Sequence, residues 1–156
     1  MTARRRLLAA AARTSVAAAA VLALTGCERP TPIVTVVSGT TSEWREADVY
    51  CFEGQSGDDC SSHEVSTPRI PVTPGQRVGV DVDKAVVERG WYVTLEAPGS
   101  QGEPSESEIQ VDAHYFSFPA PNVGPEGLRL TVRAIDPEDV RGGGTTGEWT
   151  FDLVPR

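Results

Sequence analysis

Apolar and polar residues alternate along much of this chain. A period of two gives a β-strand one buried face and one solvated face, and it does not fit the period of a helix. Four segments show the alternation: residues 77–83, 91–97, 128–134 and 148–153. Residues 33–37 and 49–52 are apolar on both faces, which predicts strands covered on each side. Residues 63–72, interrupted by Pro68 and Pro71, are expected to add another strand.

Turn signals separate the alternating segments at short intervals. They are Pro74-Gly75, Pro98-Gly99, residues 119–124 and Gly142-Gly143-Gly144. Seven or eight short strands with this spacing predict an all-β fold, an antiparallel immunoglobulin-like β-sandwich over residues 33–156. The helical candidate is residues 84–89, which end at Gly90, while residues 100–108 and 136–147 are expected to be loops.

The N-terminal region has the pattern of a bacterial lipoprotein signal peptide. Basic residues at 4–6 precede an apolar run over residues 15–24, which is too short to span a bilayer. The run ends in Leu24-Thr25-Gly26-Cys27, which matches the lipobox, where a peptidase cleaves before a cysteine that carries diacylglycerol. The sequence therefore predicts a signal peptide over residues 1–26 and a lipidated Cys27. The alternative is a signal peptide without lipidation and an incidental cysteine.

Lipidation of Cys27 would hold the protein on the outer face of the cytoplasmic membrane. Residues 27–32 would then be a short tether, stiffened by two prolines, between the lipid and the sandwich. We expect no transmembrane helix in the mature chain. The pair Arg4-Arg5 leaves both Sec and Tat export open.

The mature chain is acidic. Residues 1–26 hold four of the 14 basic residues and none of the 22 acidic ones, so the remainder carries a net charge of −12. Such a surface repels the phosphate backbone of DNA or RNA. Nucleic acid is therefore excluded as a class of partner.

Cys51 and Cys60 remain once Cys27 is assigned to the lipid. An even pair in an oxidising compartment predicts a Cys51–Cys60 disulfide. The eight residues between the two cysteines fit neither a Cys-x-x-Cys redox motif nor a zinc spacing. A redox or metal pair is therefore the weaker alternative.

Carboxylate and imidazole groups gather just around the second cysteine of this pair. The candidate metal ligands are Asp58, Asp59, His63 and Glu64. Their order matches no known metal motif, and a solvated acidic loop is the competing interpretation. The mature chain has no methionine, which disfavours a copper site, and we expect no cofactor.

The candidate catalytic residues are few. The chain has two histidines and no Gly-x-Ser-x-Gly elbow. His114 shares strand parity with two phenylalanines and is expected at the margin of the core. Asp81 and Asp83 share a strand face and could act as paired carboxylates. The favoured interpretation is instead a solvated sheet face, with ion pairs to Arg129 or Arg133.

The three tryptophans differ in their surroundings. Trp91 and Trp149 occupy inward positions of predicted strands, whereas Trp44 lies in a polar segment. Trp44 is therefore the candidate for a surface aromatic side chain that could stack on a sugar.

Five segments of the mature chain occur in the same order as in a family of bacterial proteins that the chain resembles. They are Cys27-Glu28-Arg29-Pro30-Thr31-Pro32, the pair Cys51 and Cys60, residues 74–82, Gly90-Trp91 and residues 147–153. Together they resemble an actinobacterial family of secreted lipoproteins described only as a domain of unknown function. The likeness covers nearly the whole mature chain. It implies an extracytoplasmic, lipid-anchored protein and implies no particular activity, ligand or site.

These observations favour a non-enzymatic, lipid-anchored envelope module that binds a protein partner through a sandwich face or a loop end. The alternative is a binder of a small solute or divalent metal that uses residues 58–64. A hydrolase that uses Asp81 and Asp83 ranks last. The partner's identity and the oligomeric state are left open.

Overall fold

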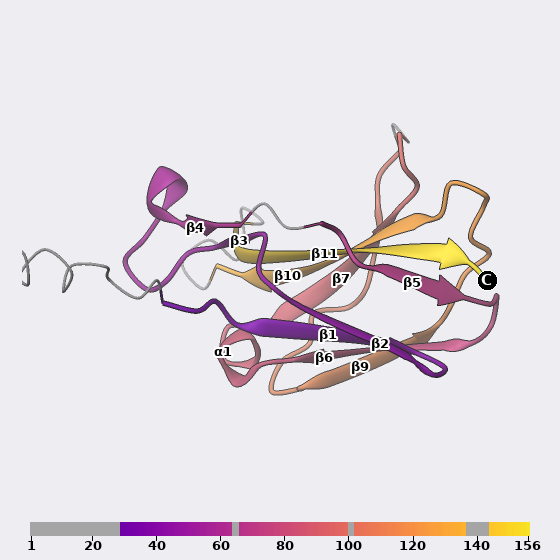
Figure 1. Ribbon diagram of the computed structural model, residues 1–156. Helices are drawn as coiled ribbons and strands as arrows, with labels where there is room; N and C mark the ends of the chain where they lie inside the picture. Colours follow the sequence, from indigo (N-terminus) through magenta and orange to yellow (C-terminus); the bar gives the residue numbers. More distant parts are fainter. Residues whose placement is uncertain (1–28, 64–65, 100–101, 137–143) are drawn as a thin grey trace, which may run out of the picture. The chain divides into compact units, whose positions relative to one another are not determined.

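The computed structural model describes residues 29–63, 66–99, 102–136 and 144–156. The predicted signal peptide and Cys27 lie outside the described residues, as does Glu64. The chain divides into two compact units, residues 1–30 and 31–156, and all the β-structure described below belongs to the second. Figure 1 shows two layers of strands in this unit, as expected of a sandwich.

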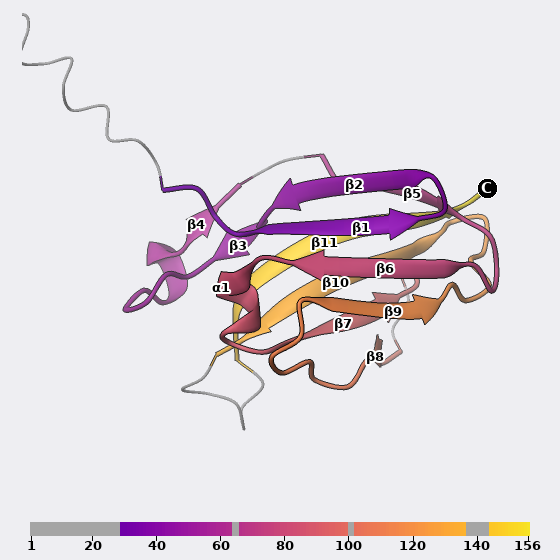
Figure 2. The same ribbon diagram turned by 90° about the horizontal axis from the view of Figure 1, so that it is seen from below.

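Sheet A is the smaller layer. It consists of β1 (Ile33–Ser38), β2 (Thr41–Glu46), β6 (Arg77–Val82) and β9 (Tyr115–Pro119). Neighbouring strands are antiparallel in the order β2-β1-β6-β9, which can be followed in Figure 2. A tight turn joins β1 to β2, and Gly39 supplies the positive φ of 59° that this turn requires.

Sheet B is the larger layer. It consists of β3 (Val49–Tyr50), β4 (Ser61–Ser62), β5 (Arg69–Val72), β7 (Trp91–Glu96), β8 (Ser105–Glu106), β10 (Leu128–Ile135) and β11 (Thr145–Pro155). The order is β4-β3-β11-β10-β7-β8 with antiparallel neighbours. The exception is β5, which pairs in parallel with the end of β11.

The core lies between the two sheets. Sheet A contributes valines from β1 and β6, and sheet B contributes larger side chains from β7, β10 and β11. The fully buried members are Val34, Val36, Val78, Val80, Trp91, Leu130, Val132, Trp149, Phe151 and Leu153. Both buried indoles have acceptors: Trp91 Nε1 donates to Ala113 O at 2.7 Å, and Trp149 Nε1 donates to Pro32 O at 2.9 Å. The period-two pattern therefore predicted the sandwich and its inward tryptophans, and both predictions are confirmed.

One short helix connects the layers. α1 (Lys84–Val87) follows β6 of sheet A and precedes β7 of sheet B. Gly90, with a φ of 80°, ends the connection after the helix. Val86 and Val87 are buried, so this turn also covers one end of the core. The helical prediction for residues 84–89 is confirmed.

The described residues contain eleven strands, more than the seven or eight expected, because β2, β4 and β8 were not predicted. β8 falls within residues 100–108, which were expected to be a loop. The prediction that 33–37 and 49–52 are covered on both faces is wrong. Ile33 is 36% exposed and Val49 41% exposed, because no further layer covers the outer faces of these strands in the described part of the chain.

Candidate functional site

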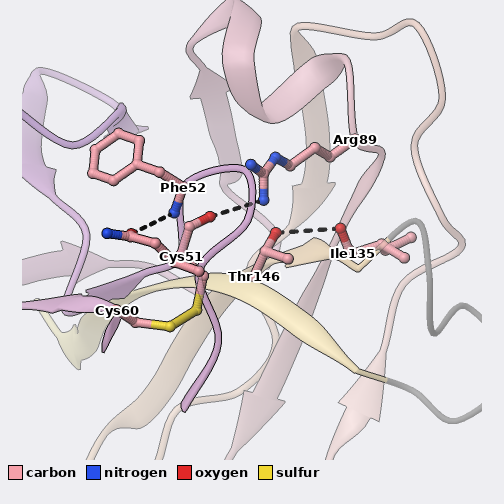
Figure 3. The surroundings of a disulfide bond; sticks show 7 residues. Cys51, Phe52, Cys60, Arg89, Ile135 and Thr146 are labelled. Atoms are coloured by element: carbon pink, nitrogen blue, oxygen red, sulfur yellow. Dashed lines mark hydrogen bonds between the residues drawn. A yellow bond between two sulfur atoms is a disulfide. The ribbon is translucent and has the colours of Figure 1, made fainter. Parts of the chain in front are cut away.

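The sulfur atoms of Cys51 and Cys60 form a disulfide, as the sequence predicts (Figure 3). Hydrogen bonds hold the start of the loop on sheet B. The Cys51 amide donates to Thr146 O at 2.7 Å, and Arg89 Nη1 donates to Cys51 O at 3.1 Å. The Arg89 guanidinium also lies 5.1 Å from the centre of the Tyr50 ring, within the range of a cation–π contact.

The candidate metal ligands follow this loop. Asp58 and Asp59 lie in the 3₁₀ turn Gly57–Asp59 and are exposed, while the His63 amide donates to Asp48 O at 2.9 Å. Glu64 lies outside the described residues. Within the described ranges, no group of three or more His, Cys, Asp or Glu side chains is arranged to hold a metal ion.

A pocket of about 270 Å³ lies beside the disulfide loop. Its lining comprises Phe52, Glu53, Gly54, Gln55, Ser56, Arg89, Asp136 and Thr146. Three polar side chains of its wall, those of Arg89, Gln55 and Thr146, form hydrogen bonds within the protein. Arg89 donates to Cys51 O, and Gln55 Oε1 accepts from the Phe52 amide at 3.0 Å. We therefore interpret the pocket as a space beneath the disulfide loop and not as a binding site.

The candidate catalytic residues lie near one another where β6 and β9 pair, since the Val82 amide donates to His114 O, but no hydrogen bond or ion pair joins the side chains of His114, Asp81 and Asp83 in the described part of the chain. His114 is exposed rather than at the core margin, and its Nδ1 lies 3.1 Å from Val82 O. Asp83 accepts a hydrogen bond from the Ile33 amide at 2.7 Å, so its carboxylate joins β1 to the end of β6. Asp81 is exposed on the outer face of sheet A.

The predicted ion pairs of Asp81 and Asp83 are wrong. Arg129 pairs with Asp152 at 3.5 Å, and Arg133 pairs with Glu148 at 3.4 Å. Both arginines belong to β10 of sheet B and face neighbouring residues of β11, whereas Asp81 belongs to sheet A. The sequence indicates which residues of a strand share a face, but it does not indicate to which sheet each strand belongs.

An apolar groove of about 220 Å³ opens where β9 of sheet A faces β7 and β8 of sheet B. Its lining comprises Val93, Leu95, Ser105, Glu106, Ser107, Phe116 and Phe118. Phe116 and Phe118 point from β9 toward the core, and their ring centroids are 5.9 Å apart. Both rings are only partly buried, so the space between the two sheets is open to solvent along this side.

β9 is also the outermost strand of sheet A in the described chain. The Val82 amide donates to His114 O at 2.9 Å, and the Ala120 amide donates to Gln76 O at 2.7 Å. The backbone N–H and C=O groups of the even-numbered residues of β9 therefore face β6. Because these directions alternate along a strand, the N–H and C=O groups of Tyr115 and Ser117 point away from β6. The Ser117 carbonyl accepts a hydrogen bond from Arg77 Nη1 at 3.3 Å.

No pattern in the sequence predicts this combination of an edge strand and a groove. The alternation Tyr-Phe-Ser-Phe at 115–118 marks a strand with aromatic residues on one face. Its position at the edge depends on pairing with β6, more than thirty residues earlier, which no local signal reveals.

Comparison with known proteins adds no family to these observations. No family model, curated protein or solved structure matches this chain. In the described residues, no helix has the length and apolar character needed to cross a membrane.

Proposed function

We propose that this chain is a lipid-anchored, non-enzymatic protein of the outer face of the cytoplasmic membrane that binds an extended segment of a protein partner along β9. The lipobox at residues 24–27 and the basic and apolar segments before it support the anchor. One observation supports the binding role: the edge strand β9 borders an apolar groove. A partner could therefore bind to the backbone of β9 and place side chains in the groove at the same time.

Strand addition explains both parts of this edge. A strand laid beside β9 would pair its backbone with the outward groups of Tyr115 and Ser117. Alternate side chains of that strand would point between the sheets, onto Phe116, Phe118 and Leu95. The backbone contacts contribute about 0.5–1.5 kcal/mol each, and side chains that fill the groove add the hydrophobic contribution and set specificity.

The positions of the ionisable residues support a role without catalysis. Asp83 accepts from the Ile33 amide, His114 Nδ1 contacts Val82 O, and Asp81 is exposed on the outer face of sheet A. General acid–base chemistry needs such groups to converge on one reacting centre. Because no hydrogen bond joins these three side chains, the arrangement favours a binding role over the hydrolase.

The test uses a proline at the edge. Because the Ser117 amide points away from β6, Ser117→Pro removes a donor needed by an added strand and removes no backbone hydrogen bond between β6 and β9. Ser117→Ala is the matched control, since it keeps the backbone amide. A photoreactive phenylalanine analogue at Ser117, in the native host, would identify the contacting protein segment. The same analogue at exposed Ser42 on the opposite edge strand gives the background.

A synthetic peptide of the cross-linked segment is then titrated against the full-length protein. We expect equal affinity for the wild type and Ser117→Ala, and a loss of about tenfold or more in Ser117→Pro. Equal binding by Ser117→Pro would overturn the proposal. Cross-links from residue 117 that do not exceed those from residue 42, or that join only copies of this chain, would also overturn it.

A further inference from the structure

The outer face of sheet A carries two exposed aromatic side chains at the same level. The pairing register aligns Trp44, Thr35, Asp81 and Tyr115 across the four strands β2, β1, β6 and β9. Residues aligned in this way share a face of the sheet. The flanking residues Val34, Val36, Val80 and Val82 are buried inward, so this row points outward. Trp44 is 63% exposed and Tyr115 55% exposed.

The Tyr115 ring lies over Gly79. A Cβ atom at Gly79 would come within 2.8 Å of Tyr115 Cε2 and Cζ, so the ring occupies the space that a side chain would fill. Gly79 is buried although it lies on the outer face. The ring thus rests on the backbone of β6 and keeps about half of its surface open to solvent.

The surface between the two aromatic residues is mixed in character. Thr35 and Asp81 occupy the same row, and Ser42, the partly buried Val37, Gly79 and Ser117 occupy the next level of the same face. Strands are spaced by about 4.8 Å and residues along a strand by about 3.4 Å, so Trp44 on β2 and Gly79 on β6, where the Tyr115 ring rests one level further along, are about 12 Å apart. This separation accommodates a short run of sugar rings.

We propose that this face, defined by Trp44, Thr35, Gly79, Asp81 and Tyr115, binds a neutral glycan. Aromatic faces carry negative quadrupole charge and attract the C–H faces of pyranose rings. The Asp81 carboxylate, exposed between them, accepts hydrogen bonds from sugar hydroxyls. Three carboxylates on or beside this face, Asp81, Asp83 and Glu46, outweigh the positive charge of Arg77 and disfavour an acidic glycan by charge repulsion.

The spacing of the aromatic residues favours a glycan over a protein at this face. Protein interfaces concentrate binding energy in a contiguous, dehydrated apolar centre. Here Thr35 and Asp81 separate Trp44 from Tyr115 within their row, and the apolar Val37 beside them is only partly exposed. The two sites use side chains on different faces of β9, because Phe116, Phe118 and the groove lie on the face opposite the Tyr115 ring, while strand addition also uses the backbone of Tyr115 and Ser117.

The fluorescence of Trp44 provides a direct measurement. All three tryptophans are described, and Trp91 and Trp149 are fully buried, so quenching by acrylamide reports mainly on Trp44. The full-length protein, purified in detergent, is titrated with glycogen, laminarin, mannan and arabinogalactan, and with polygalacturonate as an acidic glycan. We expect at least one neutral polysaccharide to protect Trp44 from acrylamide and to retard the protein in affinity electrophoresis.

Variants locate the binding. Trp44→Ala and Tyr115→Ala should each weaken retardation by about tenfold or more, whereas Trp44→Phe keeps a stacking ring and should retain most of it. Val111→Ala, which removes an exposed apolar side chain outside sheet A, is the control. The proposal is overturned if no neutral polysaccharide binds, if polygalacturonate binds best, or if both alanine variants bind like the wild type. These results leave the Ser117→Pro test of strand addition unaffected.

Discussion

Arg45 of sheet A donates a hydrogen bond from Nη1 to the backbone oxygen of Thr150 in sheet B at 2.5 Å. Asp48 completes the arrangement: one carboxylate oxygen contacts Arg45 Nη2, and the other accepts from the Thr150 amide at 2.8 Å. Thr150 lies between the stretch of β11 that pairs with β3 and the stretch that pairs with β5. The side chains of Arg45 and Asp48 therefore bond to the backbone C=O and N–H of Thr150, which pairs with neither β3 nor β5.

Replacement of Arg45 by Met is expected to destabilise the protein strongly. The Arg45 side chain is only 3% exposed, and its loss would leave Asp48 Oδ1 and the Thr150 carbonyl without their Arg45 donors. Breaking a buried pair of this kind costs about 3–5 kcal/mol. Urea unfolding of wild type and variant measures the difference.

Arg129→Met is the matched control. Arg129 also pairs with an aspartate, but its side chain is 53% exposed, so solvent screening limits the loss to about 0–1 kcal/mol. Similar losses in the two variants would show that the contact between the sheets has no special contribution.

Removal of the disulfide by Cys51→Ala together with Cys60→Ala should lower the free energy of unfolding by about 2–3 kcal/mol. The cross-link closes a loop of about ten residues, and its removal restores conformational freedom to the unfolded chain. Urea unfolding gives the magnitude, and reduced wild-type protein provides a second comparison. Unchanged stability in both samples would contradict the prediction.

Hydrogen exchange should locate the effect of this substitution. The Gln55 amide, bonded to Phe52 O within the loop, should exchange faster than in the wild type. The Val132 amide, in the centre of sheet B, should keep its rank among the slowest.

Gly79→Ala should destabilise the protein in the presence of Tyr115 and not in its absence. The new methyl group would displace the Tyr115 ring, whereas the backbone of Gly79 has an ordinary strand conformation that alanine can adopt. In a Tyr115→Ala background the same change should stabilise the strand by about 0.5–1 kcal/mol. A double-mutant cycle from urea unfolding measures this coupling. Equal effects in the two backgrounds would show that the ring does not rest on Gly79.

Cys27→Ala should release the protein from the membrane. In the wild type we expect a mature N-terminal peptide that begins at residue 27 and carries the mass of its acyl chains, because acyl chains supply the membrane affinity. Mass spectrometry of the peptide and fractionation of cells provide the measurements. Cys51→Ala should stay in the membrane fraction. A mature N-terminus at another residue, without acyl mass, would contradict lipid anchoring.

The alternating segments could be recognised in the sequence because their buried faces are apolar, as in β6, β7, β10 and β11. β2 escaped prediction because its inward positions are Thr41, Glu43 and Arg45 rather than hydrophobic residues. Arg45 can be buried there because its partners come from Asp48 and from Thr150, 105 residues later. A polar strand of this kind depends on contacts that local sequence does not contain.

The candidate sites were predictable to different degrees. Trp44 was identified as a surface aromatic residue because its neighbours in the sequence are polar, and its 63% exposure confirms this. Tyr115 was missed because its role depends on the absence of a side chain at Gly79, which lies on another strand. The groove beside β9 was missed for a similar reason, since two strands from different sheets form its walls.

β11 lies between β3 and β10 and also pairs with β5, although it is the last strand of the chain. During synthesis, those three strands leave the ribosome before the strand that joins them. A nascent chain that stops before residue 145 therefore carries β3, β5 and β10 with unpaired edges, which are sites of aggregation. β3, β5 and β10 can join in sheet B only after β11 (Thr145–Pro155) has been synthesised.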